Sequence, residues 1–199
     1  LLITGDVGTG KTTLCRRLLD QLPDNTATAL VLNPLFSDRR QLLRAIMKDF
    51  EIPSGSADSA SEEIEALNQF LLERNRSDGN AVVIIDEGQH LSNDSLEMVR
   101  LLSNLETEKK KLLQIVLVGQ PELRDRLQQP ELRPLNQRLT VKFHLMPLDR
   151  NETREYIHFR LKKAGSQGEI EFFEPALDLI FTYTGGYPRR INLLGERVL

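Results

Sequence analysis

A glycine-rich segment, GDVGTGKTT, occupies residues 5–13 and constrains the fold more than any other part of the chain. It fits the spacing G-x-x-x-x-G-K-[ST] and lies between an apolar run, LLIT, and a helical pattern, TTLCRRLLDQL. In a strand–loop–helix of this kind, successive backbone N–H groups face one anion, and the start of the helix adds its positive dipole end. The segment therefore predicts a phosphate-binding loop in a sheet covered by helices.

The side chains of this loop have expected roles of their own. Lys11 is expected to reach the β- and γ-phosphates of a nucleotide, and Thr12 to hold Mg²⁺ through its hydroxyl. Thr13 is placed to donate to the α-phosphate. A glycine-rich turn that binds nothing is the alternative interpretation, but the strand and helix on either side argue against it. We predict that nucleotide and Mg²⁺ are bound by Gly5, Asp6, Val7, Gly8, Thr9, Gly10, Lys11, Thr12 and Thr13.

Two adjacent carboxylates end another apolar run, VVIID at 82–86 followed by Glu87. In proteins with this phosphate loop, a neighbouring strand ends in an aspartate that helps to hold Mg²⁺, a role that suits Asp86. Glu87 is expected to point the other way, because side chains alternate along a strand. A carboxylate one water away from the γ-phosphate can accept the proton of the attacking water. We predict Asp86 as a metal ligand and Glu87 as the catalytic base, with a solvated acid pair as the alternative.

Apolar runs and helical patterns alternate as far as residue 146, and the pattern is purely helical afterwards. Near-continuous apolar strands separated by helices imply a parallel sheet covered on both faces. The expected class is α/β, a P-loop NTPase with a five-stranded parallel core over 1–146 and a small all-helical lid over 147–199. Its strands are expected at residues 1–4, 28–33, 81–86, 112–119 and 140–145.

Composition fits a soluble protein of moderate size. The chain has 199 residues, 40% of them hydrophobic, and a formal charge of −3, which argues weakly against a large nucleic-acid footprint. The one cysteine, Cys15, shares a helical face with leucines and is expected to be a buried core thiol. No apolar run reaches membrane-spanning length. The chain opens inside a strand and stops inside a helical pattern, so we interpret it as a fragment of a longer protein.

Other classes of P-loop protein fit less well. A GTPase usually carries an [NT]-K-x-D motif, which is not found, and a small-molecule kinase usually lacks a carboxylate base beside the metal aspartate. A helicase with a DEAH motif needs a second RecA-like domain, for which 199 residues leave no room. His90 is then expected to be an ordinary helix-start or surface residue.

The order of the motifs resembles an AAA+ ATPase over essentially the whole chain. The details resemble the ExeA / general secretory pathway protein A family, secretion-associated ATPases of Gram-negative bacteria with relatives in pilus and exopolysaccharide export. The matching blocks are GDVGTGKTT, LNPLFSDRRQLLRAI, IIDEGQHLS, IVLVGQPELRDRL, LNQRLTVKFHLMPL and TGGYPRRINLL.

The resemblance implies roles for further polar residues. Gln120 falls at the sensor-1 position, where Asn is commoner and a polar side chain touches the attacking water or the γ-phosphate. Asn33 falls where many relatives keep an asparagine that restrains the catalytic glutamate; a turn residue is the alternative.

Two arginines also receive roles from the resemblance. Arg138 matches the finger that reaches into a neighbouring subunit's site, with Arg133 as the fallback and a surface arginine as the alternative. Arg189, the sensor-2 arginine, is expected to point at the γ-phosphate from a helix that starts at Pro188, and Arg190 to point outward. An exposed helix-start arginine is the alternative for Arg189.

The resulting expectation is an ATP- and Mg²⁺-dependent ATPase that forms a homo-oligomer, a dimer or ring, and works on secretion components. The domain would be cytoplasmic, and the parent protein anchored in the inner membrane. A nucleotide-gated scaffold with slow hydrolysis is one alternative. A DNA-handling ATPase is another, for which the basic run at 108–111 would grip phosphates, although a solvated loop explains that run as well.

Overall fold

The computed structural model describes residues 1–36, 38–53, 59–108 and 110–198. They form two compact units: residues 1–4 with 12–144, and residues 5–11 with the chain from 145 onward. The phosphate loop thus belongs to the same unit as the C-terminal helices. The division into a nucleotide-binding core over 1–146 and a lid over 147–199 stays a prediction.

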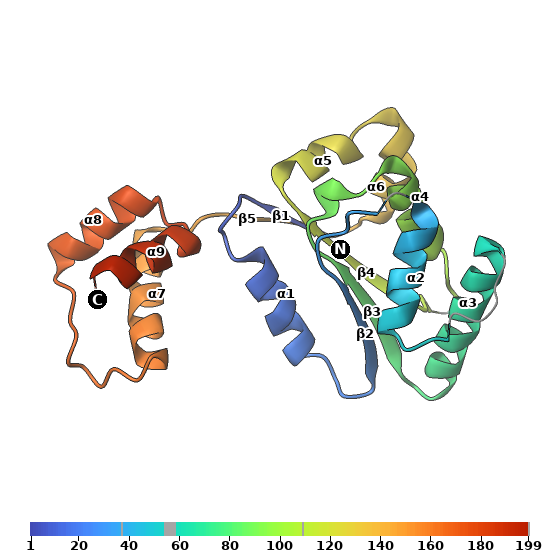
Figure 1. The fold of residues 1–199 in the computed structure, drawn as a ribbon, viewed down its shortest axis with the longest axis horizontal. Helices are drawn as coiled ribbons and strands as arrows, with labels where there is room; N and C mark the ends of the chain where they lie inside the picture. Colours follow the sequence, from blue (N-terminus) through green and yellow to red (C-terminus); the bar gives the residue numbers. More distant parts are fainter. Residues whose placement is uncertain (37, 54–58, 109, 199) are drawn as a thin grey trace. The chain divides into compact units, whose positions relative to one another are not determined.

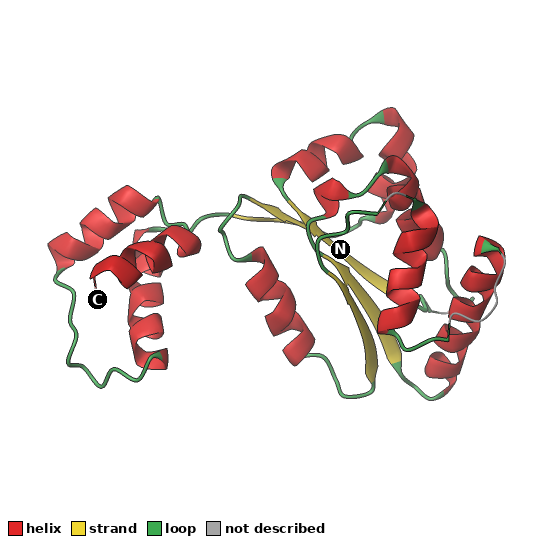
Figure 2. Cartoon of the chain, in the orientation of Figure 1, coloured by secondary structure: helices red, strands yellow, loops and turns green. Residues whose placement is uncertain are grey.

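A five-stranded sheet in the described residues has the order β2-β3-β4-β1-β5 (Figures 1 and 2). The pairs β2–β3, β3–β4 and β1–β4 are parallel. This confirms the predicted α/β class and puts the carboxyl ends of β1, β3 and β4 side by side. The strands are β1 (Leu2–Gly5), β2 (Thr26–Val31), β3 (Asn80–Ile85), β4 (Gln114–Gly119) and β5 (Lys142–Leu145).

Helices cover both faces of the sheet, with α1 on one face and α2 to α4 on the other (Figure 1). Asp38 caps α2 and Ser59 caps α3, each by accepting from backbone N–H groups of the first turn. The helices are α1 (Lys11–Asp20), α2 (Arg39–Asp49), α3 (Ala60–Arg76), η1 (Gly88–His90), α4 (Asn93–Leu102), α5 (Pro121–Leu127), η2 (Pro130–Leu132) and α6 (Arg133–Arg138).

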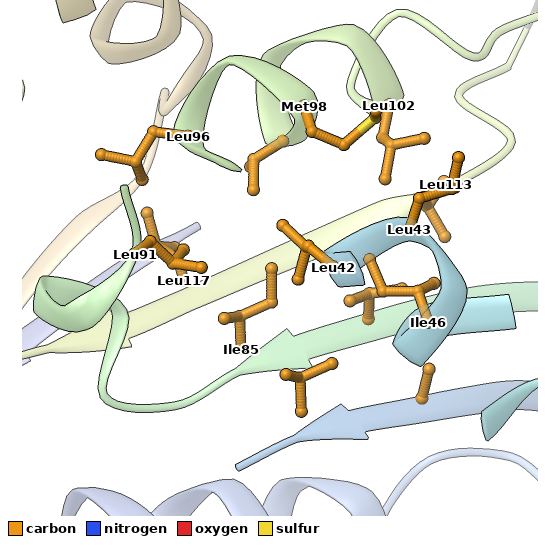
Figure 3. Packing of buried hydrophobic residues seen from close by; sticks show 14 of the residues in the cluster. Leu42, Leu43, Ile46, Ile85, Leu91, Leu96, Met98, Leu102, Leu113 and Leu117 are labelled. Carbon is orange, nitrogen blue, oxygen red and sulfur yellow. The ribbon is translucent and has the colours of Figure 1, made fainter. Parts of the chain in front are cut away.

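Successive residues of each central strand are buried on opposite faces. In β3, Ile85 packs with leucines of α2 and α4 (Figure 3), whereas Ile84 belongs to the cluster around Cys15 on α1. Cys15 is 1% exposed, as its helical spacing predicts. Because both faces are apolar, the strand reads as a continuous hydrophobic run and not as an alternating one.

The second unit has its own small core, formed by apolar side chains of three helices. These are α7 (Arg150–Lys163), α8 (Glu174–Thr184) and α9 (Pro188–Val198). Gly185 adopts the left-handed conformation that ends α8, and Pro188 begins α9, as expected. No described helix combines the length and apolar character needed to cross a bilayer.

Two strands end earlier than predicted. Strand β2 stops at Val31 instead of Asn33, and β3 stops at Ile85 instead of Asp86. The last hydrogen bond of this pair runs from the Asp86 N–H to the Val31 carbonyl, at 2.9 Å. Asn33 then takes a positive φ of 49°, a left-handed conformation that Asn tolerates, and the chain leaves the sheet.

Candidate active site

The loop between β1 and α1 encloses the ammonium group of Lys11. Lys11 Nζ donates to the carbonyls of Gly5 at 2.7 Å and Asp6 at 2.9 Å, and the residue is only 6% exposed. Gly8 and Gly10 have φ values of 88° and 99°, which suit glycine. No carboxylate pairs with Lys11 among the described residues. A buried cation held only by neutral carbonyls is suited to an anionic ligand.

The same loop contacts the start of α9 within the second unit. The Tyr187 hydroxyl donates to Asp6 Oδ2 at 2.7 Å, and this hydrogen bond raises the pKa of Tyr187. The Arg189 N–H donates to the Gly8 carbonyl at 3.2 Å. Arg189 itself is exposed, and the guanidinium of Arg190 lies over the Tyr187 ring, 4.6 Å from its centroid. Arg189 is therefore held beside the phosphate loop through its backbone.

In the first unit, the hydroxyl of Thr12 donates to Asp86 Oδ2 at 2.6 Å. Asp86 is 2% exposed, and its other oxygen accepts from the Glu87 N–H at 2.8 Å. Hydroxyl and carboxylate oxygens are ligands that Mg²⁺ takes in nucleotide sites. The two predicted metal ligands, 74 positions apart in the chain, therefore meet as a set that fits Mg²⁺.

Glu87 differs from its expected geometry. It is not part of the alternating strand: its φ and ψ of 53° and 37° are left-handed, and it precedes the short helix η1. Its carboxylate oxygen Oε2 accepts from the side-chain amide of Gln89 and, at 3.4 Å, from that of Gln120. The structure thus brings Gln120, the predicted sensor residue, to the predicted base.

The remaining predicted residues lie away from Glu87. Asn33 is exposed in the turn after β2, and the amides at the Glu87 carboxylate belong to other residues. Arg138 ends α6 and lines a cavity of about 550 Å³ together with Leu1 and Gln114, at the amino ends of the strands. Glu87 follows the carboxyl end of β3, so Arg138 lies at the opposite end of the strands from Glu87. Arg133, at the start of α6, is also exposed.

Sequence reasoning missed two polar residues. Gln89 contacts Glu87, and Tyr187 contacts the phosphate loop. Both lie inside the motif blocks IIDEGQHLS and TGGYPRRINLL, in which the predicted roles fall on charged residues. The local signal for Gln89 is a polar side chain two positions after the predicted base, and this spacing alone does not predict the contact with Glu87. His90 is exposed, as expected.

The class of protein can now be stated. A family model described as "AAA domain" matches residues 1–127, so the chain belongs to the AAA domain family. Over all 199 of its residues the chain is 45% identical to general secretion pathway protein A of Aeromonas hydrophila, and it spans 36% of that protein's length. The resemblance predicted from the motif blocks is confirmed.

Solved structures with low sequence identity share the fold. The ORC2 protein of Aeropyrum pernix, in ADPNP–ADP complexes, matches with a TM-score of 0.71 and 16% identity over 98% of this chain and 55% of its own. Cdc6p of Pyrobaculum aerophilum matches with a TM-score of 0.70 and 20% identity, over 97% of this chain and 53% of its own. A RuvB mutant of Thermotoga maritima matches with a TM-score of 0.60 and 22% identity, over 99% of this chain and 54% of its own. These confirm the predicted AAA+ P-loop architecture.

Proposed function

We propose that this chain binds Mg–ATP and hydrolyses it, as the motor or switch of a bacterial secretion or export system. The observation that carries the proposal is the 2.6 Å hydrogen bond between Thr12 and Asp86, which joins the end of the phosphate loop to the strand that leads into Glu87. The A. pernix ORC2 structure contains ADPNP and ADP, which supports an adenine nucleotide.

Each group has a distinct part in this chemistry. The loop N–H groups and Lys11 would bind the phosphates, and Thr12 and Asp86 would hold Mg²⁺, which would supply positive charge to neutralise the phosphate oxygens. Glu87 orients a water molecule and accepts its proton through a carboxylate oxygen. Gln120 fixes the position of Glu87, and Arg189 contacts the γ-phosphate. The exposed guanidinium of Arg138 stabilises charge in the site of a neighbouring copy.

The similarity to general secretion pathway protein A of A. hydrophila supports a role of hydrolysis in secretion. We propose that copies of this chain assemble as a dimer or ring on the cytoplasmic side of the membrane. Hydrolysis would change the assembly and so act on secretion components. The parent protein would be anchored in the inner membrane.

Steady-state phosphate release from Mg–ATP tests this function, with Glu87→Gln as the diagnostic variant. We expect turnover that requires Mg²⁺ and falls about 100-fold or more in Glu87→Gln, because a general base contributes about 10²–10⁴-fold. Binding of a fluorescent ATP analogue to Glu87→Gln should stay intact, since the phosphate loop is unchanged. Equal turnover in both proteins would contradict the assignment.

A nucleotide-gated scaffold is the second candidate: it would bind ATP, assemble, and hydrolyse ATP only to reset the assembly. The same variant separates the two candidates in a secretion assay. A motor loses function in Glu87→Gln, whereas a scaffold held in its ATP state assembles more readily and keeps working.

A DNA-handling role is the third candidate, but the described lysines of the basic run face carboxylates. Lys110 lies 3.7 Å from Asp78, and Lys111 pairs with Glu106. Lys109 lies outside the described residues. If DNA is the partner, salt-dependent binding at low ionic strength should weaken when the three lysines are replaced. No binding under those conditions would exclude this candidate.

A further inference from the structure

We propose that Gln89 is a positioning residue for hydrolysis, whose side-chain amide holds the Glu87 carboxylate against the end of β4. The inference rests on the proposed function, because it adds a residue to the same site. Gln89 lies in η1, is half-buried and donates from Nε2 to Glu87 Oε2. The Gln89 contact is the shorter of the two amide contacts, because Gln120 Nε2 lies 3.4 Å from Glu87 Oε2.

The orientation of the Gln89 amide is determined from both sides. Gln89 Oε1 accepts from the backbone N–H of Gln120 at 3.0 Å, while Nε2 faces the Glu87 carboxylate. A backbone N–H can only donate and an ionised carboxylate can only accept. A flipped amide would lose both hydrogen bonds, so the side chain has one productive orientation. Gln89 therefore links the predicted base to the backbone of the sensor residue.

The backbone around Gln89 is built to keep the side chain there. Its carbonyl accepts from Arg126 Nη1 at 2.8 Å. A Cβ at Gly119 would lie 2.9 Å from Gln89 Oε1, and a Cβ at Gly88 would lie 2.9 Å from Leu117 Cδ1. Both glycines thus allow η1 to pack closely on the end of β4.

These contacts hold the Glu87 carboxylate in place through one of its two oxygens, Oε2. The left-handed backbone of Glu87 is unfavourable for a non-glycine residue, so this conformation needs support from its surroundings. Oε2 receives both amides, while Oε1 has no hydrogen-bond partner among the described residues. Oε1 is therefore the oxygen left to accept a proton. The resemblance suggested a restraining contact from Asn33 to Glu87, but the amide at the Glu87 carboxylate is that of Gln89, and its proposed role is to position the base.

Replacing Gln89 by Leu tests this role, because Leu keeps much of the volume and removes the amide. We expect kcat for ATP to fall by about 10- to 100-fold, part of the contribution of a general base. KM and the binding of the ATP analogue should stay unchanged, because Gln89 does not touch the phosphate loop. Gln128→Leu, the same change at an exposed position of the same unit, is the matched control. Gln89→Met serves if the Leu variant fails to fold.

A double-mutant comparison separates positioning from a structural role. In the Glu87→Gln background, Gln89→Leu should change the residual rate by less than about twofold, since it acts through the missing carboxylate. An equal loss in both backgrounds, or an unchanged or higher kcat in the single variant, would overturn the inference. The proposed function fails separately, if wild-type protein has no turnover or Glu87→Gln keeps it.

Discussion

The Thr12 hydroxyl donates to Asp86 at 2.6 Å, and its oxygen would also bind the proposed Mg²⁺. Thr12→Val keeps the side-chain shape but removes the hydroxyl, and we expect ATP turnover to fall by about 10²–10³-fold, the loss typical of one electrostatic contact in a transition state. Phosphate release titrated with Mg²⁺ checks this.

Thr12→Ser is the control, because it keeps the hydroxyl and should retain most of the turnover and the Mg²⁺ dependence. If Thr12→Val hydrolyses ATP as fast as Thr12→Ser, the hydroxyl has no part in the site.

At single positions, the sequence predicts chemistry better than conformation. The phosphate loop and Asp86 could be predicted because their spacing is tied to a strand end, and Gln120 was predicted from the family resemblance. The alternation argument for Glu87 was wrong, because β3 ends one residue early and Glu87 turns left-handed. Gln89 could not be assigned, since its partner Gln120 comes 31 positions later and meets it only through strand pairing.

At the level of elements, a buried carboxylate joins α2 to α3. Glu63 is 1% exposed and accepts from Arg40 Nε at 2.9 Å and Arg44 Nε at 2.7 Å. Burial alone would raise the pKa of Glu63, but the hydrogen bonds from both arginines outweigh it, and the pKa is lowered. We expect Glu63→Gln to reduce the free energy of unfolding by about 1–3 kcal/mol, because Arg40 and Arg44 each lose a charged hydrogen-bond acceptor.

The lowered pKa also gives this interaction a pH dependence. A carboxyl whose folded-state pKa lies below its ordinary value of 4.5 stabilises the fold fully above that pH, and the contribution is lost as pH falls through the folded-state value. Urea unfolding at several acidic pH values should show a smaller stability difference between wild type and Glu63→Gln as the pH falls. Glu73→Gln, at an exposed position of α3, should show no such trend.

The turn between α8 and α9 depends on Gly186. Its φ is 74°, and a Cβ there would lie 1.8 Å from the Leu148 carbonyl oxygen, so Gly186→Ala should lower the thermal midpoint of the second unit or prevent its folding. Gly195→Ala is the matched control in α9, where a Cβ meets nothing within 4 Å. It should stabilise by about 0.5–1 kcal/mol. Equal melting points for the two variants would contradict this description.

Elements were largely predictable from the sequence, and their ends were not. The order of strands and helices follows from apolar periodicity and from caps such as Asp38. The end of β2 depends on the turn at Asn33, which periodicity cannot report. The phosphate loop belongs to the unit of the C-terminal helices through contacts between residues far apart in the chain, such as Tyr187 and Asp6, which are 181 positions apart. No local sequence pattern predicts such contacts.

At the scale of the whole molecule, Arg138 lies at the amino ends of the strands, away from Glu87 of the same chain. We therefore predict that Arg138 completes the hydrolysis site of a neighbouring copy. We expect turnover per chain to rise with protein concentration, because a finger supplied by a neighbour completes the site only on assembly. Arg138→Ala and Glu87→Gln should each be inactive alone, and mixing them should restore turnover at interfaces that pair the intact base with the intact arginine.

Arg133→Ala distinguishes the two candidate arginines of α6. Loss of turnover in Arg133→Ala, with turnover kept in Arg138→Ala, would assign the finger to Arg133. A rate per chain that does not depend on concentration, with no recovery on mixing, would make Arg138 an ordinary surface residue.

The most direct test of hydrolysis at Thr12, Asp86 and Glu87 is a single-turnover measurement of phosphate release, with protein in excess over Mg–ATP. This measurement does not depend on product release, so it also detects the slow hydrolysis of a scaffold. We expect a phase of phosphate release in the wild-type protein that requires Mg²⁺ and is slowed about 100-fold or more in Glu87→Gln. Bound ATP that stays intact in the wild-type protein, or the same rate in both proteins, would contradict it.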